Sequence, residues 1–318
     1  MNLHLPDFLF VVTLATAAAA PALGQDAVPA VGPANRSDIQ GAASVPDFSG
    51  IWAHLTWPDV ELPLSGPGPV KNLTRRNGVP DIYKLIGDYN NPILKPQAAE
   101  AVKKQGEIEL TGALAPSPRN QCWPGGVPFV ITNVGMQMLQ QPDKITILYA
   151  DTYEVRRVRM NQPHPARVTP SWYGDSVGRY EGDTLVIDTV GIKTDRPYAM
   201  VDWFGTPYSG ALHVVERYRL LDYNAAKVAE ERGERENLGV PVTEQGFARN
   251  PEYKGKGLQL ELTVEDEGTF TTPWSATMTY RRPLSPLGQW PEIVCSENAA
   301  GYDRGDKAAA PTADKPDF

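Results

Sequence analysis

The stretch Asp175 to Thr189 reads Asp-Ser-Val-Gly-Arg-Tyr-Glu-Gly-Asp-Thr-Leu-Val-Ile-Asp-Thr, and its pattern decides the fold. A polar turn with a central glycine, Glu181 to Asp183, separates two runs that contain apolar and β-branched residues. Such a turn between two such runs is typical of a β-hairpin. The stretch therefore predicts two strands, Ser171 to Tyr180 and Thr184 to Ile192.

The chain on both sides repeats this pattern. From Leu258 to Val264, apolar residues alternate with polar ones, which is typical of a strand with one buried face. We expect a mainly β fold in which sequential antiparallel strands close into a lipocalin-like barrel. The further strands expected are Ile145–Ala150, Tyr153–Met160, Ala211–Leu221, Leu258–Glu265 and Trp274–Arg281.

The N-terminal part of this barrel domain, residues 46–144, is rich in proline and glycine and predicts an irregular collar. It contains one helix candidate, Pro96 to Glu109, which begins with proline. A long insertion, residues 223–257, separates two strands and contains a charged, helix-prone run from 225 to 236. We expect a lid or a solvated surface insertion there, and we expect residues 225–257 to be dispensable for folding.

The two ends of the chain predict segments outside the barrel domain, which we place at residues 46–302. Residues 1–24 resemble a signal peptide because an apolar, alanine-rich run ends in small residues, although the segment before the run has no basic residue. A membrane anchor is the alternative, and the short run and Pro21 argue against it. Residues 25–45 and 303–318 predict a flexible lead-in and a disordered tail. The chain is therefore expected to be exported to the periplasm or beyond, without stable membrane insertion after cleavage.

Composition narrows the classes of partner and cofactor. The formal net charge of −8 argues against a nucleic-acid partner. The histidines show no metal-binding spacing, and no dinucleotide or phosphate-binding motif occurs, so we expect neither a metal nor another cofactor. A small-molecule ligand or substrate remains the expected partner, while the sequence does not indicate an oligomeric state.

Cys122 and Cys295 are the only cysteines in the chain. Two cysteines in an exported protein are expected to pair, and this pair would join the collar to the end of the barrel. Free thiols or metal ligands are the weaker alternatives.

Two resemblances extend this interpretation. The run from Ser171 through Thr189, with Leu212 to Tyr218, Thr272 to Trp274 and Pro46 to Trp52, resembles a family of uncharacterised secreted bacterial proteins with a Ser-Val-Gly-Arg-aromatic-Glu-Gly-Asp-Thr motif. That resemblance implies an exported β architecture and no particular chemistry. Gly50-Ile51-Trp52 is similar to the first strand of lipocalin-like barrels, which implies that Arg281 or Arg282 covers the tryptophan ring.

Glu216 is the first catalytic candidate. It shares a strand face with Leu212, Val214, Tyr218 and Leu220, so its carboxylate is expected inside the barrel. A carboxylate there must be paired or functional, because burying an unpaired charge is costly. Arg157 is the expected partner, either in a structural salt bridge or as a group that stabilises negative charge.

His213 and His164 are the other catalytic candidates, as groups that move a proton. His213 is expected on the face opposite Glu216, and His164 in a proline-rich loop at the barrel mouth. Each has a structural alternative, a hydrogen-bonded histidine. The expected substrate-binding residues are Tyr173, Asp175, Arg179, Trp203 and Trp274, although ion-paired turn residues and ordinary core aromatics explain them equally well.

We expect an exported, cofactor-independent enzyme that transfers protons, in isomerisation, elimination or cyclisation, on a small, partly apolar molecule. One alternative is a non-catalytic lipocalin-like protein that binds a small molecule. Another is an interaction module of the cell envelope that uses the collar or the insertion, which a filled barrel with an apolar patch on its outside would favour.

Overall fold

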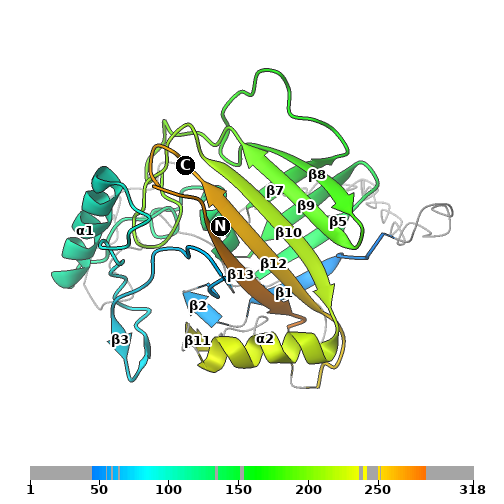
Figure 1. Cartoon of the computed structure of the whole chain (residues 1–318), viewed down its shortest axis with the longest axis horizontal. Helices are drawn as coiled ribbons and strands as arrows, with labels where there is room; N and C mark the ends of the chain where they lie inside the picture. The colour runs from blue at the N-terminus through cyan, green and yellow to red at the C-terminus, as the bar shows by residue number, and fades with distance from the viewer. Residues whose placement is uncertain are drawn as a thin grey trace, which may run out of the picture. The chain divides into compact units, whose positions relative to one another are not determined.

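The computed structural model shows a closed barrel of nine strands in sequential order (Figure 1). It describes residues 45–54, 56–58, 60–63, 65–132, 135–150, 154–235, 239–241, 250 and 252–283. The expectation of a mainly β barrel is confirmed. The barrel strands are β1 (Gly50–His54), β5 (Gly135–Gln140), β6 (Lys144–Tyr149), β7 (Val155–Met160), β8 (Asp175–Glu181), β9 (Thr184–Val190), β10 (His213–Leu221), β12 (Gly257–Glu265) and β13 (Trp274–Arg281).

One strand pair departs from the expected antiparallel pattern. β7 and β8 run parallel, with Arg159 opposite Val177, whereas the other neighbouring barrel strands are antiparallel. The reason is parity: in a closed ring with an odd number of strands, alternation of direction cannot be complete. The segment 161–174 must therefore return along the barrel before β8 begins, instead of forming a hairpin.

The collar is smaller than expected because β5 is a barrel strand. Its sequence, Gly-Met-Gln-Met-Leu-Gln, has no β-branched residue, so strand propensity gave no signal. Within the collar, α1 (Pro96–Leu110) confirms the expected helix. Its buried residues Ala98, Val102, Gly106 and Glu109 follow helical spacing and form one face. Two short pairs of strands complete the described elements: β2 (Thr56–Pro58) with β11 (Gly239–Pro241), and β3 (Arg75–Arg76) with β4 (Val79–Pro80).

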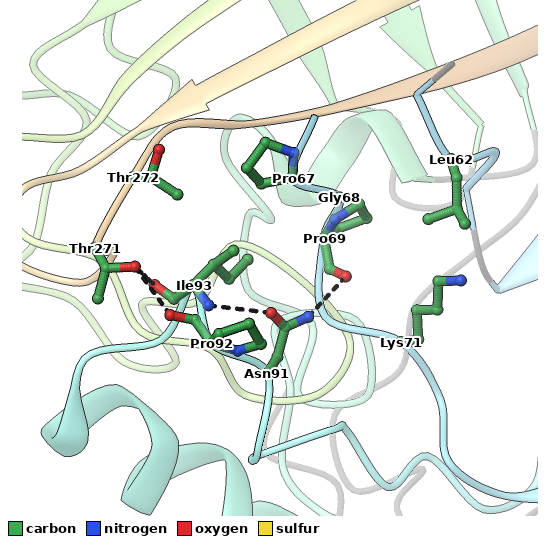
Figure 2. Close-up of a pocket in the computed structure, with 10 residues that line it drawn as sticks. All are labelled: Leu62, Pro67, Gly68, Pro69, Lys71, Asn91, Pro92, Ile93, Thr271 and Thr272. Atoms are coloured by element: carbon green, nitrogen blue, oxygen red, sulfur yellow. Dashed lines mark hydrogen bonds between the residues drawn. The ribbon is translucent and has the colours of Figure 1, made fainter. Parts of the chain in front are cut away.

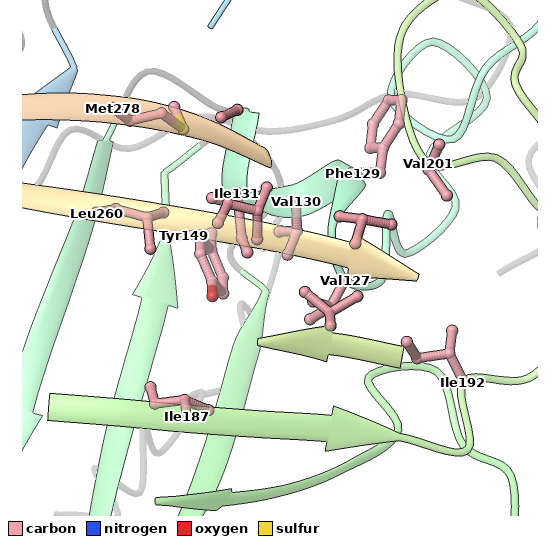
Figure 3. Packing of buried hydrophobic residues seen from close by; sticks show 14 of the residues in the cluster. Val127, Phe129, Val130, Ile131, Tyr149, Ile187, Ile192, Val201, Leu260 and Met278 are labelled. Atoms are coloured by element: carbon pink, nitrogen blue, oxygen red, sulfur yellow. The ribbon is translucent and has the colours of Figure 1, made fainter. Parts of the chain in front are cut away.

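Side chains fill the barrel interior. Figure 3 shows Val130 and Ile131, from a short 3₁₀ helix at Phe129–Thr132, among side chains of the barrel wall such as Leu260 and Met278. These residues belong to one buried hydrophobic cluster, which runs from the barrel interior into the collar. The interior is therefore a packed core, as in small barrels whose side chains meet in the centre.

Trp52 on β1 has the cover that the sequence predicts. The Arg282 guanidinium lies 3.7 Å from the centre of the Trp52 ring. Arg282 also donates hydrogen bonds to the carbonyl oxygens of Ile51 (3.0 Å) and Ser49 (2.8 Å). Gly50 is required beneath it, because its φ is 111° and a Cβ there would overlap the guanidinium. Of the two arginines considered, Arg282 covers the ring.

Arg281 instead holds the helix of the insertion. α2 (Tyr223–Arg235) confirms the expected helix and packs where β10 ends and β12 begins (Figure 1). Glu230 and Arg281 form a buried ion pair of 2.6 Å, and Ala226 has no exposed surface. A Cβ at Gly257 would come within 2.6 Å of the Ala226 Cβ, so glycine permits this close approach. The helical part of the insertion is therefore packed on the barrel and is not only a solvated surface segment, while the dispensability of residues 225–257 for folding stays a prediction.

Other expectations lie outside the described residues. The signal-like segment 1–24, nearly all of the lead-in, the tail 303–318 and Cys295 belong there. The Cys122–Cys295 disulfide stays a prediction. Within the described part of the chain, no helix is long and apolar enough to span a membrane.

Replacing Glu230 with glutamine should lower the free energy of unfolding by about 3 kcal/mol, because Arg281 would stay buried without a counter-charge. Glu231→Gln, on the exposed side of the same helix, is the matched control and should cost roughly 0.5 kcal/mol or less. Urea unfolding measures both. Equal midpoints for Glu230→Gln and the wild type would show that α2 does not stabilise the barrel.

Candidate functional site

The candidate residues divide between the inside and the outside of the barrel wall. Inside, Glu216 has no exposed surface, as its place in an apolar row predicts. Its two carboxylate oxygens accept hydrogen bonds from Arg156 Nη1 (3.1 Å) and Arg156 Nη2 (2.6 Å). Tyr218 also donates its hydroxyl to Glu216 at 2.7 Å. Glu216 therefore pairs with an arginine, as expected, but the arginine is Arg156 and not Arg157.

Arg157 was the wrong partner, because the even-numbered positions of β7, and not the odd-numbered ones, face the barrel interior. Ile147 pairs with Arg156, so these two side chains share the inner face of the barrel. Arg157 is exposed on the outer face. The two-residue turn that the sequence predicts at 151–152 implies the same pairing of Ile147 with Arg156. Across such a turn the inward-facing positions change from odd to even residue numbers, whereas Arg157 was predicted on the assumption that they stay odd.

The rest of the Arg156 guanidinium is satisfied by neighbouring strands. Arg156 donates to Ser176 Oγ (3.0 Å), Thr189 Oγ1 (2.6 Å) and the Tyr149 hydroxyl (3.2 Å). Burial raises the pKa of Tyr149 to about 12, with Glu216 adding to the shift and Arg156 opposing it, so this phenol stays neutral at physiological pH. The pair is thus fully hydrogen bonded in a closed core. We infer a structural role for Glu216 and Arg156.

Outside the wall, side chains that are distant in sequence meet in what we call the histidine cluster: Arg159, His164, Asp175, Asp188, His213 and Glu265. His164 Nδ1 lies 2.7 Å from Asp175 Oδ2, and His164 Nε2 lies 3.1 Å from Asp188 Oδ1. The same Asp188 oxygen lies 3.0 Å from His213 Nε2. One carboxylate oxygen therefore joins two imidazoles.

The two flanks of the cluster carry opposite charges. Arg159 donates two hydrogen bonds to Asp175, of 2.9 and 2.8 Å. At the other end, His213 Nδ1 lies 3.6 Å from Glu265 Oε2, at the limit of direct contact. His164 and His213 are 25% and 33% exposed, so both imidazoles are accessible to solvent.

Strand ends and the parallel pair bring this cluster together. Asp175 begins β8, His213 begins β10, Glu265 ends β12, and Asp188 lies near the end of β9. These positions are neighbours on one edge of the barrel, and their side chains point outward because the alternate positions fill the core. His164 belongs to segment 161–174, which the parallel β7–β8 pair returns along the outer wall. The hydrogen bonds of His164 fix that segment to β8 and β9.

The contact between Asp188 and His213 shifts the pKa values of both groups toward their charged forms. The hydrogen bond from His213 and the one from His164 hold the pKa of Asp188 below its ordinary value, against the effect of burial. The pKa of Asp175 is also lowered: burial opposes this shift, but hydrogen bonds from His164 and Arg159 outweigh it. The Asp188 hydrogen bond raises the pKa of His213 above 6.5, against burial and with help from Glu265. The charged form of the His213 imidazole is therefore favoured over that of a free histidine.

Asp188 orients His213 through Nε2 at 3.0 Å, while Nδ1 faces Glu265 at 3.6 Å, beyond hydrogen-bonding distance. A proton on Nε2 satisfies the Asp188 contact, which leaves Nδ1 of the neutral ring as the basic atom. A carboxylate that holds one ring nitrogen and leaves the other for proton transfer is a common catalytic arrangement. His164 differs because each of its ring nitrogens lies within 3.1 Å of a carboxylate oxygen, which suits a residue that positions the segment.

Of the five expected substrate-binding residues, Asp175 belongs to the cluster and the other four do not. Arg179 is exposed and bonds Glu181 at 2.8 Å. Trp203 packs on Phe129, with ring centres 4.8 Å apart, and Trp274 packs edge-on against Phe270 at 5.9 Å. Tyr173 is partly buried, and burial followed by the nearby Glu154 raises its pKa. The two tryptophans are core residues, as their structural alternative predicted.

Sequence reasoning missed Asp188, Arg159 and Glu265 as site residues. For Asp188 a signal existed: in the strand Thr-Leu-Val-Ile-Asp-Thr it takes the face opposite Leu185 and Ile187, and is therefore on the outside. Its meeting with His213 depends on the β9–β10 register, Val214 opposite Thr189. The connection 191–212 is too long to set that register from sequence alone.

Among the described residues, no group of three or more histidine, cysteine or acidic side chains is arranged to hold a metal ion. Comparison with models of protein families, with curated protein sequences and with solved structures finds no match to this chain. The chemistry must therefore be argued from the cluster itself.

Replacing Glu216 with glutamine should lower the free energy of unfolding by about 3–5 kcal/mol, because Arg156 would remain buried without its counter-charge. Replacing both partners, Arg156→Met with Glu216→Leu, should cost less than the single change. Glu261→Gln, on the exposed face of β12, is the control. If Glu216→Gln unfolds like the wild type in urea, the pair does not support the barrel.

The histidine cluster should make stability depend on pH. His213 has a raised pKa in the folded state, so its contribution is complete below about 6.5 and is lost as pH rises through the folded value. Asp175 and Asp188 have lowered pKa values, so their contribution is lost only in acid. The wild type should therefore exceed His213→Gln in melting temperature by more at pH 5.5 than at pH 9. A difference that grows toward pH 9 would contradict this assignment.

Proposed function

We propose that this chain is an exported, cofactor-independent enzyme that transfers protons on a small, partly apolar molecule, with His213 as the base and acid. The observation that supports the proposal is the contact of His213 Nε2 with Asp188 Oδ1, at 3.0 Å, on a side chain that is 33% exposed and whose Nδ1 lies 3.6 Å from Glu265. The Asp188 hydrogen bond raises the pKa of His213 above its ordinary value, which makes the imidazole a stronger base.

In the proposed step, His213 Nδ1 removes a proton from a carbon next to a carbonyl group. The C–H bond breaks, the N–H bond forms, and the electron pair moves onto the carbonyl oxygen as an enolate. The imidazolium that forms is stabilised by Asp188, which keeps its negative charge because its own pKa is lowered. Where the substrate is a β,γ-unsaturated carbonyl compound, the resulting dienolate takes the proton from His213 at its γ-carbon, and the double bond moves into conjugation with the carbonyl group, which completes an isomerisation. His164 and Asp175 are positioning residues, which hold Asp188 and segment 161–174.

The non-catalytic carrier is the weaker candidate in its lipocalin-like form. A ligand inside the barrel would have to displace packed side chains, because Glu216, Tyr149 and Tyr218 are fully or almost fully buried among a continuous core. The part of the proposal that concerns export is supported by the signal-like segment 1–24. The part that concerns a small-molecule substrate is supported by the composition of the chain.

Deuterium exchange tests the proposal without knowledge of the complete reaction. The protein is incubated in D₂O with a panel of small enolisable ketones and thioesters, and mass spectrometry measures deuterium uptake at carbon. At least one compound should exchange with the wild type, and His213→Asn should lower that rate by about a hundredfold or more. Asp188→Asn should lower it as well, since the imidazole loses its orientation.

Arg217→Gln is the matched control, because Arg217 lies on the same outer face of β10 and pairs only with Glu181 among the interactions of the described residues. It should exchange like the wild type. Circular dichroism and melting temperature must show that each variant is folded. Exchange that His213→Asn retains in full, or no exchange above buffer across the panel, would overturn the proposal.

A further inference from the structure

The collar, together with Thr271 and Thr272 just before β13, lines an open hollow that contains no residue of the histidine cluster. It has a volume of about 560 Å³, within the range of small-molecule sites. Three segments form its walls, as Figure 2 shows, and none of their residues belongs to the cluster: Leu62, Pro67, Gly68, Pro69, Lys71, Asn91, Pro92, Ile93, Thr271 and Thr272.

Hydrogen bonds between the three segments give the walls a fixed shape. Thr271 Oγ1 donates to the carbonyl of Pro92 at 2.9 Å, and the Thr271 backbone N–H donates to the carbonyl of Ile93 at 2.8 Å. Asn91 Nδ2 donates to the carbonyl of Pro69 at 3.3 Å, which joins the other two walls (Figure 2). Three prolines fix the backbone further. A site that exists before its ligand arrives loses little conformational freedom on binding.

Some polar side chains in the walls already hydrogen bond within the protein, and another can still interact with a ligand. The side chains of Asn91 and Thr271 are used to hold the walls together. Lys71 is the one charged residue that lines the hollow, and its ammonium has no ion-pair partner among the described residues. The lining is otherwise dominated by Leu62, Ile93 and prolines. An apolar surface with a single cation at its side is complementary to an apolar molecule with one negative charge.

We propose that this hollow binds a small organic anion, with an apolar body against Leu62 and Pro92 and a carboxylate or sulfonate at Lys71. The proposal is independent of the acid–base chemistry at His213. The two sites share no residue, so either can fail without the other.

1-Anilinonaphthalene-8-sulfonate tests this proposal directly, because it combines an apolar aromatic body with one sulfonate. Titration of the folded wild type should show one saturable site by fluorescence, confirmed by calorimetry. Lys71→Glu should weaken binding at least tenfold. Lys84→Glu, a charge reversal at another collar lysine that does not line the hollow, should leave the affinity unchanged.

Two further measurements locate the probe. Thr272→Trp, at an exposed position on the rim, should block the hollow and abolish binding with the melting temperature unchanged. N-phenyl-1-naphthylamine, which lacks the sulfonate, should bind Lys71→Glu and the wild type equally. Binding of the sulfonate that Lys71→Glu and Thr272→Trp both retain, or fluorescence that does not saturate, would overturn the proposal.

Discussion

One ion pair, Arg156 with Glu216, joins strands β7 and β10 through the interior of the barrel. Neither side chain has exposed surface, so each depends on the other, and on the hydroxyls of Tyr149, Ser176, Thr189 and Tyr218, for the hydrogen bonds that water would otherwise provide. These partners come from β6, β8, β9 and β10, so the network connects most of one side of the barrel wall. Such a network need not add much net stability, but its partial loss is costly.

The number of strands has an equally direct consequence for the outer wall. Nine strands cannot alternate in direction around a closed ring, and the one parallel pair, β7 with β8, obliges segment 161–174 to return along the outside. That segment carries His164, and the two carboxylates that hold it also reach Arg159 and His213. The parallel β7–β8 pair thus places segment 161–174 on the outer wall, where His164 contributes to a partly exposed cluster of titratable groups. Inside the barrel, the charges of Arg156 and Glu216 are fully buried. On the outside, the imidazole of His213 is 33% exposed and its Nδ1 lies 3.6 Å from Glu265.

Local patterns predicted much of this. Alternation correctly placed Glu216 inside and His213 outside, found most barrel strands, and indicated both helices; the Gly-x-Trp run indicated an arginine over Trp52. Failures arose where local pattern carries no information. The strand Gly135–Gln140 lacks β-branched residues, and the parallel pair follows from a count of strands around the ring, to which β5 contributes. Arg156 was missed through an error of parity at one turn, which the hairpin register would have corrected. Asp188 meets His213 only through a register set by tertiary packing.

The central claim is that the chemistry belongs to His213 and Asp188 on the outer wall, while Glu216 serves the core. Long-range ¹H–¹⁵N correlation spectra of ¹⁵N-histidine-labelled protein, recorded across pH and assigned with His213→Asn, test it most directly. The account predicts that the pKa of His213 lies above 6.5, that the neutral ring keeps its proton on Nε2, and that Asp188→Asn lowers the pKa. A His213 that titrates at or below 6.5, or whose neutral ring carries its proton on Nδ1, would contradict it.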